Sequence, residues 1–353
     1  MKIYKYTEDL NAYSRSISDN PDDVLYFDIE TTGLSPMRSD LYIIGYGYIQ
    51  DNLYHINLLF NDDGISEPDM LSEFSDLIKK YKYLVSYNGG TFDIPYIRTK
   101  FKQFDIADTL DTITSIDVYK TTRKYKKIFQ LPSVKQVDIE DIVGFKRQSY
   151  ISGGDLIAAY KNYLHNNSQE LLQSMLTHNL DDIRGLISIS DCVNLSHLHE
   201  CHVETIENTD SAITYTCSIP YIPCRLTYAD SHFRINAYHH SMHVSVFVVH
   251  TSMKYYFKDY KNYYYLPMEG IAIHKSMATY VDSSHKEKAT KNTAFTIKES
   301  NFVYSPGKKN KEVFYNTDNR DTGYIEVSSH ILAPCNDADC YVSQIITSAL
   351  PHC

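Results

Sequence analysis

The chain has 353 residues and a formal net charge of −10 at pH 7, with 43% hydrophobic and 22% charged residues. This composition is globular, because a disordered chain has fewer apolar residues and a fibrous chain has far more than 13 Gly and 11 Pro. The length predicts about two domains, and the acidic balance disfavours indiscriminate coating of nucleic acid, which depends on cations.

The first ten residues carry acids where a signal peptide has an apolar core. No stretch approaches the roughly 18 apolar residues of a membrane span. The seven Cys are an odd number and are scattered along the chain, which fits a reducing compartment better than a disulfide framework. We therefore expect a cytoplasmic protein that does not bind membranes.

The first half of the chain alternates strand-like and helix-like patterns. Strands are expected at 25–30, 41–48, 53–60 and 84–87, the first three as an antiparallel meander. Amphipathic helices are expected over 68–81 and from Asn167 to about residue 190.

From about residue 196 the pattern changes to β-rich sequence. It includes an apolar strand at 243–249, a hairpin over 255–265 and a strand pair at 293–297 and 301–304. We expect three parts, which are a first domain over 1–195, a connector over 196–235 and a smaller β-rich accessory domain of unknown role over 236–353.

Four carboxylates on three separate elements are candidates for one metal site. Asp28 and Glu30 are two residues apart on a strand and project from the same face. Adjacent acids repel each other unless a cation lies between them. Asp93 follows a Gly-containing loop, and Asp182 lies on the last helix of the first half. Mg²⁺ or Mn²⁺ prefer such oxygen ligands, and two ions about 3.5–4 Å apart promote phosphodiester hydrolysis.

His178 lies four positions before Asp182, so a helix places both side chains on one face and turns Asp181 away. An imidazole, with an ordinary pKa of about 6.5, could take a proton from an attacking water at neutral pH. A supporting or helix-surface role for His178 is the alternative.

A basic segment without acids covers residues 120–127. If it is helical, Lys120, Arg123, Lys124 and Lys127 share one stripe that suits a phosphate backbone, whereas the alternative is a solvated helix face.

Several further groups leave two interpretations open. Asn88 either holds the loop before Asp93 or touches the substrate, and Asp117 is either a fifth acid near the site or a helix-starting or solvated residue. Cys and His residues over 192–224 hint at zinc, although their spacing matches no familiar finger. Tyrosines over 255–265 could stack on unpaired bases, but alternation in a hairpin favours packing for some of them.

Three motifs resemble, in the same order, the exonuclease motifs of the DEDD superfamily within the ribonuclease H-like fold. They are FDIETTGL (27–34), SYNGGTFDIPYI (86–97) and HNLDDIRGL (178–186). Three segments between these motifs resemble the YprB-type branch of that fold. They are IDVYKTTRKYKK (116–127), DIVGFKR (141–147) and SGGDLIAAYKNYL (152–164). Joint matches are far less accidental than single ones.

The resemblance covers about residues 20–195 and implies an α/β fold, a mixed sheet flanked by helices. It also implies 3′→5′ exonuclease activity on single-stranded or frayed nucleic acid, with two Mg²⁺ or Mn²⁺ held by Asp28, Glu30, Asp93 and Asp182. Thr31 and Asn88, in the first two motifs, are expected substrate contacts, as are Arg123, Lys124 and Lys127. Family members that use Tyr as the proton-handling residue place it four positions before the last Asp, and members that use His place it five positions before. This chain has a His, His178, at the position four before Asp182.

Two rival functions remain open at this stage. One is a catalytically silent nucleic-acid-binding module, and the other is an endonuclease of the same fold. The sequence leaves open the choice between DNA and RNA and gives no indication of protein partners.

Overall fold

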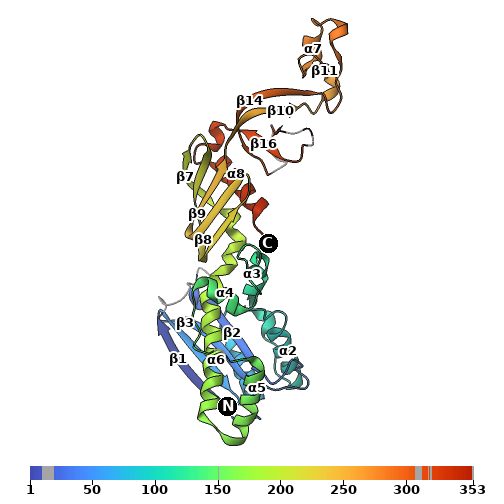
Figure 1. Cartoon of the computed structure of the whole chain (residues 1–353). Helices are drawn as coiled ribbons and strands as arrows, with labels where there is room; N and C mark the ends of the chain where they lie inside the picture. Colours follow the sequence, from blue (N-terminus) through green and yellow to red (C-terminus); the bar gives the residue numbers. More distant parts are fainter. Residues whose placement is uncertain (10–19, 150, 307–311, 317, 319, 352–353) are drawn as a thin grey trace. The chain divides into compact units, whose positions relative to one another are not determined.

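The computed structural model describes residues 1–353 except 10–19, 150, 307–311, 317, 319 and 352–353. It divides into two compact units, traced in Figure 1. The first unit contains residues 1–196 together with 221–225, and the second contains 197–220 and the chain from 226 onward. Within the described residues, no helix is both long enough and apolar enough to span a bilayer.

The first unit is built on a six-stranded mixed sheet in the order β1-β4-β3-β2-β5-β6. The strands are β1 (Lys2–Asp9), β2 (Val24–Thr31), β3 (Leu41–Gln50), β4 (Leu53–Phe60), β5 (Tyr83–Ser86) and β6 (Thr114–Asp117). β2 pairs antiparallel with β3 and parallel with β5, which continues in parallel to β6. The predicted mixed sheet and its antiparallel meander are confirmed.

Helices cover this sheet. They are α1 (Glu67–Ile78), α2 (Asp93–Gln103), α3 (Val118–Thr122), α4 (Gln136–Val143), α5 (Gly153–Asn166) and α6 (Gln169–Ile189), with 3₁₀ turns at Pro21–Asp23, Leu110–Thr112, Arg123–Tyr125 and Ser190–Glu200. The long helix α6 lies across β2, β3 and β4 (Figure 1).

Alternation along β2 explains which residues face which helices. Leu25, Phe27 and Ile29 enter a buried cluster with Met70 and Phe74 of α1. Because successive side chains of a strand point to opposite faces, Asp28 and Glu30 project toward the other face, where α6 lies. The hydrophobic pattern of one strand therefore directs two acids to a single side of the sheet.

A glycine lets α6 approach the sheet closely. Gly45 of β3 pairs with Asp28 of β2. A Cβ added at Gly45 would lie 2.1 Å from Asn179 Oδ1 and 3.1 Å from Ile183 Cγ1, both on α6. A larger residue there would push the helix away from the acids on the neighbouring strand.

The second unit is β-rich, as predicted. β7 (His202–Asn208), β8 (Ala212–Ala229) and β9 (Phe233–Phe247) form one sheet. A small closed barrel contains β10 (Val249–Tyr256), β14 (Phe295–Tyr304), β16 (Gly323–Glu326) and β15 (Phe314–Tyr315). A third sheet has the order β12 (Ile271–His274), β11 (Tyr263–Leu266), β13 (Glu287–Lys288), and the helices are α7 (Lys275–Ala278) and α8 (Asn336–Ala349).

Two local predictions for this unit are wrong. The hairpin over 255–265 does not form, because β10 pairs with β14 and β15 whereas β11 pairs with β12 and β13. The turn exists as a 3₁₀ turn at Tyr260–Asn262, but a turn signal does not choose a strand's partner. The strand pair expected at 293–304 is one continuous strand, β14.

Two other segments differ from the sequence patterns. Residues 196–235, expected to be a connector, contain β7 and β8. The basic segment 120–127 is not one helix, since α3 ends at Thr122 and a 3₁₀ turn follows.

Candidate functional site

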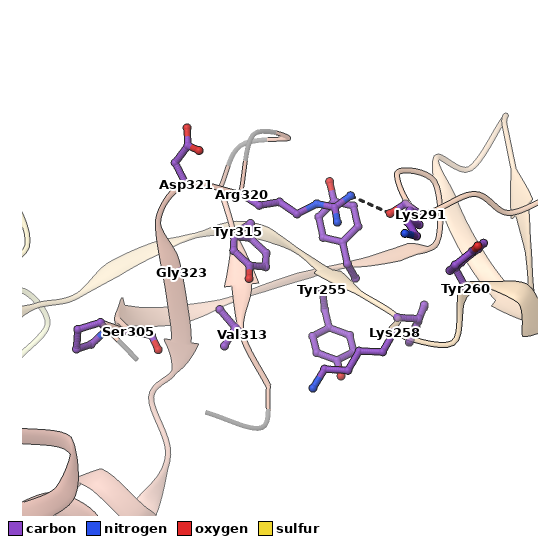
Figure 2. Close-up of a pocket in the computed structure, with 13 residues that line it drawn as sticks. Tyr255, Lys258, Tyr260, Lys291, Ser305, Val313, Tyr315, Arg320, Asp321 and Gly323 are labelled. Atoms are coloured by element: carbon purple, nitrogen blue, oxygen red, sulfur yellow. Dashed lines mark hydrogen bonds between the residues drawn. The ribbon is translucent and has the colours of Figure 1, made fainter. Parts of the chain in front are cut away.

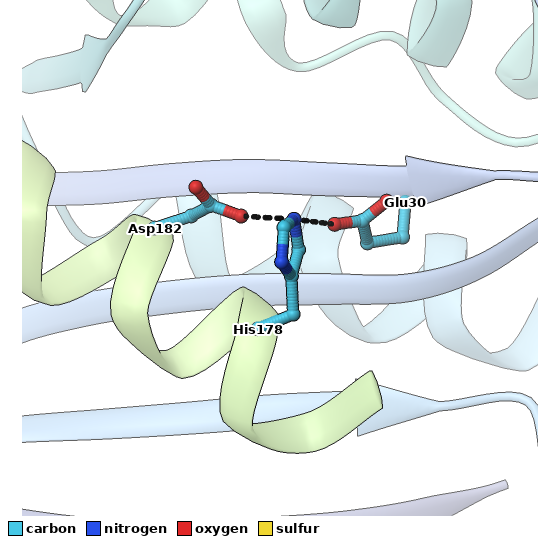
Figure 3. Close-up of side chains that lie close together, drawn as sticks. All are labelled: Glu30, His178 and Asp182. Atoms are coloured by element: carbon cyan, nitrogen blue, oxygen red, sulfur yellow. Dashed lines mark ion pairs between the residues drawn. The ribbon is translucent and has the colours of Figure 1, made fainter. Parts of the chain in front are cut away.

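Helix α6 brings His178 and Asp182 against Glu30 of β2 (Figure 3). His178 Nε2 lies 3.6 Å from Glu30 Oε1 and 3.3 Å from Asp182 Oδ2. One ligand atom from each of the three residues lies within 4.8 Å of the others. Among the described residues this is the one group of three or more His, Cys, Asp or Glu that meets this distance.

Asp28 joins the same face through α6. Asn179 Nδ2 donates to Asp28 Oδ2 at 2.9 Å, and Asn179 itself is fully buried. The close approach at Gly45 thus allows an amide to fix the orientation of this carboxylate.

Asp93 begins α2 and is 7% exposed. A neighbouring acid, Asp117, shapes the loop that leads to it, because its carboxylate accepts from the backbone N–H of Asn88 at 2.8 Å and of Gly90 at 3.4 Å. The same carboxylate caps α3 by accepting from Tyr119 N at 3.2 Å. Asp117 therefore starts a helix, as one interpretation expected, and also holds the loop.

Crowding perturbs the acids strongly. Burial, and then the negative charges of Asp182 and Asp93, raise the pKa of Asp28 and of Glu30 well above their ordinary values. Burial, with smaller contributions from Asp117 and Asp182, raises the pKa of Asp93 to about 7. Carboxylates that resist ionising together would gain from a cation placed between them.

Arg147, which the sequence did not single out for the site, holds Asp182. Its Nη1 lies 2.8 Å from Asp182 Oδ1, and its other nitrogens bind Glu140 at 2.6 and 2.7 Å. Arg147 and Glu140 side chains are only 7% and 2% exposed. A Cβ at Gly185 would lie 1.8 Å from Glu140 Oε1, so this glycine makes room for the pair.

Asp181 is placed apart from the acid cluster. It is 1% exposed, and its Oδ2 accepts from the backbone of Gln148 at 2.6 Å and of Ser149 at 2.7 Å. The neighbouring acid therefore anchors the segment after Arg147, and Asp182 alone of the two faces Glu30.

An open cavity of about 550 Å³ reaches the acids. Asp28, Glu30 and Asp182 line it, together with Tyr87 and Tyr119. The two tyrosine rings are 5.7 Å apart in an edge arrangement. The cavity therefore combines acidic groups with aromatic rings.

The five expected substrate contacts are placed differently. Asn88 lines the cavity, but Arg123, Lys124 and Lys127 do not. Arg123 lies 5.7 Å from the centre of the ring of Tyr119, which lines the cavity. The Thr31 hydroxyl donates to Gly33 O at 2.9 Å, so it shapes the end of β2.

The Cys and His residues over 192–224 do not gather into a group of three ligands within the described chain. Cys192, Cys201, Cys217 and Cys224 are buried free thiols. His202 binds Asp339 at 2.8 Å, and His197 binds Glu200 at 3.0 Å.

The donor set at the acid cluster fits a hard divalent cation. It offers carboxylate oxygens, the ligands that Mg²⁺ and Mn²⁺ prefer, beside one imidazole nitrogen. His178 Nδ1 is buried and has no hydrogen-bond partner in the part of the chain that the structure describes, while its Nε2 faces the carboxylates. This cluster is therefore the candidate place for a divalent metal ion.

Comparisons with known proteins agree with the fold of the first unit. A family model described as RNase_H superfamily matches residues 25–194. The uncharacterized protein YprB of Bacillus subtilis (strain 168) is 24% identical over 186 residues, which are 52% of this chain and 45% of YprB. The chain thus spans less than half of the length of that curated relative.

Two solved structures are also similar. The family B DNA polymerase from the hyperthermophilic archaeon Pyrobaculum calidifontis has a TM-score of 0.40 and 16% identity, covering 50% of this chain and 26% of the polymerase. A structure described as the apo form of the nuclease has a TM-score of 0.32 and 16% identity, covering 49% of this chain and 72% of its own. Together with the mixed sheet, the family match shows that residues 25–194 form a ribonuclease H-like domain, which is similar to the matched part of YprB.

Proposed function

We propose that the first unit is a divalent-metal-dependent 3′→5′ exonuclease that shortens single-stranded or frayed nucleic acid. The observation that carries the proposal is the convergence of acids from β2, α2 and α6. Burial, and then the charges of neighbouring acids, raise the pKa values of Asp28, Glu30 and Asp93. Asp28, Glu30 and Asp182 line an open cavity. Crowded ionisable groups in a cavity are typical of functional sites.

In this proposal Asp28, Glu30, Asp93 and Asp182 hold two Mg²⁺ or Mn²⁺ ions. Bound there, the ions would activate a water and stabilise charge on the leaving oxygen. His178 Nε2 lies between two of the carboxylates, so it either accepts the proton of the attacking water or adds a nitrogen ligand.

Neighbouring residues would position this machinery. Asn179 orients Asp28 through its amide, and Arg147 fixes one oxygen of Asp182 while leaving the other toward His178. Tyr87 and Tyr119 offer ring surfaces to the terminal base.

The remaining proposed contacts are polar. Asn88 lines the cavity and would contact a sugar or phosphate. Thr31, Arg123, Lys124 and Lys127 are proposed to meet the strand outside the cavity. A cytoplasmic location is part of the same proposal.

The test is nucleotide release from a strand labelled at either end, with and without Mn²⁺. We expect stepwise shortening from the 3′ end, abolished by EDTA and reduced at least about a thousandfold in Asp28→Asn and Asp182→Asn, because removing a catalytic charge costs several kcal/mol. Asp141→Asn, at a 74% exposed side chain paired with Lys146, is the matched control. Undiminished release by both site variants would refute the proposal, and cutting of circular strands would identify an endonuclease.

The contact between Arg147 and Asp182 favours a second candidate. A buried guanidinium partly neutralises the acids without any metal, which suits a silent nucleic-acid-binding module. This candidate would be established instead if the protein bound a nucleic-acid strand equally well with and without EDTA and released no nucleotides at any metal concentration.

A further inference from the structure

The second unit has a cavity of its own, of about 510 Å³, beside the small barrel (Figure 2). Its lining comes from the end of β10, from β15 and β16, and from neighbouring loops. A volume of this size lies within the range of small-ligand sites, which is about 300–1,000 Å³. The lining combines aromatic rings with cations, and nothing in the proposed nuclease chemistry uses it.

The rings of this cavity divide into packed and available ones. Tyr255 packs against Phe314 with ring centres 5.5 Å apart, so it belongs to the barrel core. Tyr260, in contrast, makes no ring contact with another described residue. Tyr315 meets Tyr256 only edge to face, at 6.1 Å. Tyr260 and Tyr315 therefore retain ring surface for a planar ligand.

A guanidinium adds a further flat surface. The Arg320 side chain lies over the Tyr256 ring, 3.7 Å from its centre. It is held there by a hydrogen bond to Lys291 O at 2.8 Å, marked in Figure 2. A second hydrogen bond joins it to Asn292 Oδ1 at 3.0 Å. Nucleobases stack on the planes of arginines as well as on aromatic rings.

The charge of the lining is opposite to that of the chain. Lys258, Lys291 and Arg320 line the cavity with one acid, Asp321, in a protein whose net charge is −10. Both lysines are exposed, and neither forms an ion pair within the described residues. Unpaired cations in an acidic protein favour an anionic ligand.

We propose that this cavity binds single-stranded nucleic acid, with bases stacked on Tyr260, Tyr315 and the Arg320 plane and phosphates beside Lys258 and Lys291. The choice of nucleic acid as the ligand rests on the proposed nuclease function, for which the cavity would retain the strand. A single strand fits better than a duplex because only unpaired bases expose their faces. It fits better than an acidic peptide because such a peptide does not require flat rings.

The test is the binding of a fluorescent single-stranded 20-mer to the full-length chain, measured by anisotropy in EDTA so that no hydrolysis intervenes. We expect Tyr260→Ala to weaken binding about tenfold and Tyr260→Phe to leave it unchanged, because stacking needs the ring and not the hydroxyl. We expect the Lys258→Ala, Lys291→Ala double variant to reduce the slope of log K against log salt by about 1.4, since each single-strand phosphate contact contributes about 0.7.

The control is the Lys5→Ala, Lys161→Ala double variant, which removes the same charge from exposed sites of the first unit. An effect equal to that of the cavity lysines would overturn the proposal, as would unchanged binding in Tyr260→Ala. Competition by a mononucleotide as strong as that by the strand would also overturn it and identify a free-nucleotide site. Preferential binding of a phosphopeptide would overturn the proposal as well and identify a protein ligand.

The two proposals can fail separately. Strand binding that depends on Tyr260 and the lysines, in a protein that never releases nucleotides, would leave the cavity assignment standing and refute the nuclease. Nucleotide release by a protein whose affinity for single-stranded nucleic acid does not depend on these three residues would refute the cavity assignment and leave the nuclease proposal standing.

Discussion

Asp93 should make the metal-free first unit less stable as the pH rises from about 4 to about 7. Its pKa in the folded protein is about 7, against an ordinary value of 3.8, chiefly because the carboxyl is buried. Between these two values the folded chain binds a proton that the unfolded chain has released. The free energy of unfolding is therefore higher at low pH, where the carboxyl is protonated, and it falls as the pH approaches 7.

The size of the effect follows from the same two values. The difference between 3.8 and about 7 corresponds to on the order of 4 kcal/mol, because one pKa unit is about 1.4 kcal/mol. For a unit of this size, 1 kcal/mol shifts the melting temperature by about 2–4 °C, so Asp93 alone lowers it by about 8–16 °C. The raised pKa values of Asp28 and Glu30 act in the same direction.

The assay is thermal unfolding in EDTA, followed by the helical circular dichroism signal, at pH values from 5 to 8. Wild type should lose stability across this range, and Asp93→Asn, which cannot ionise, should lose much less and exceed wild type at neutral pH. Saturating Mn²⁺ should restore wild type, because a cation favours the ionised acids. A melting temperature that stays level or rises with pH in EDTA, with Asp93→Asn following wild type, would refute the reasoning.

Three substitutions test packing contacts within the first unit. Gly45→Ala should destabilise the protein by about 1–3 kcal/mol in urea unfolding, because the new methyl would overlap α6. Gly154→Ala should not, because its new methyl would lie 4.0 Å from Ser152 Oγ, an ordinary contact. Equal effects of the two variants would contradict the close approach of α6. Lys100→Met should lower the free energy of unfolding by about 3–5 kcal/mol, because it leaves the buried carboxylate that Lys100 pairs with unpaired. Lys79→Met, at a side chain that is 51% exposed, should lower it by under about 1 kcal/mol. Arg147→Met should also cost about 3–5 kcal/mol in EDTA, for the same reason, and a loss under about 1 kcal/mol would show that the pair is not needed.

Local patterns predicted the elements that carry the candidate site. The strand expected at 25–30 is β2, and the helix expected from Asn167 to about residue 190 is α6. Both patterns are set by side chains a few positions apart, so the sequence alone reveals which faces Asp28, Glu30 and Asp182 occupy. How these acids act stays a prediction.

Long-range pairings could not be predicted in this way. Arg147 lies 35 positions before Asp182 in the sequence and pairs with it in the fold, and no periodicity marks an arginine for such a role. The edge strand β1 alternates between exposed and half-buried residues, so its hydrophobic signal is weak. The false hairpin after β10 arose for a related reason, since strand partners depend on the barrel as a whole.

The placement of the acids on β2 and α6 has a consequence for motion. These elements are central, and they pack together across the sheet. Amide hydrogens at Asp28, Glu30 and Asp182 should therefore exchange with deuterium only through opening of the entire unit. Under the proposed function, only the surrounding loops would adapt to different nucleic-acid strands, and the acids would keep their geometry during hydrolysis.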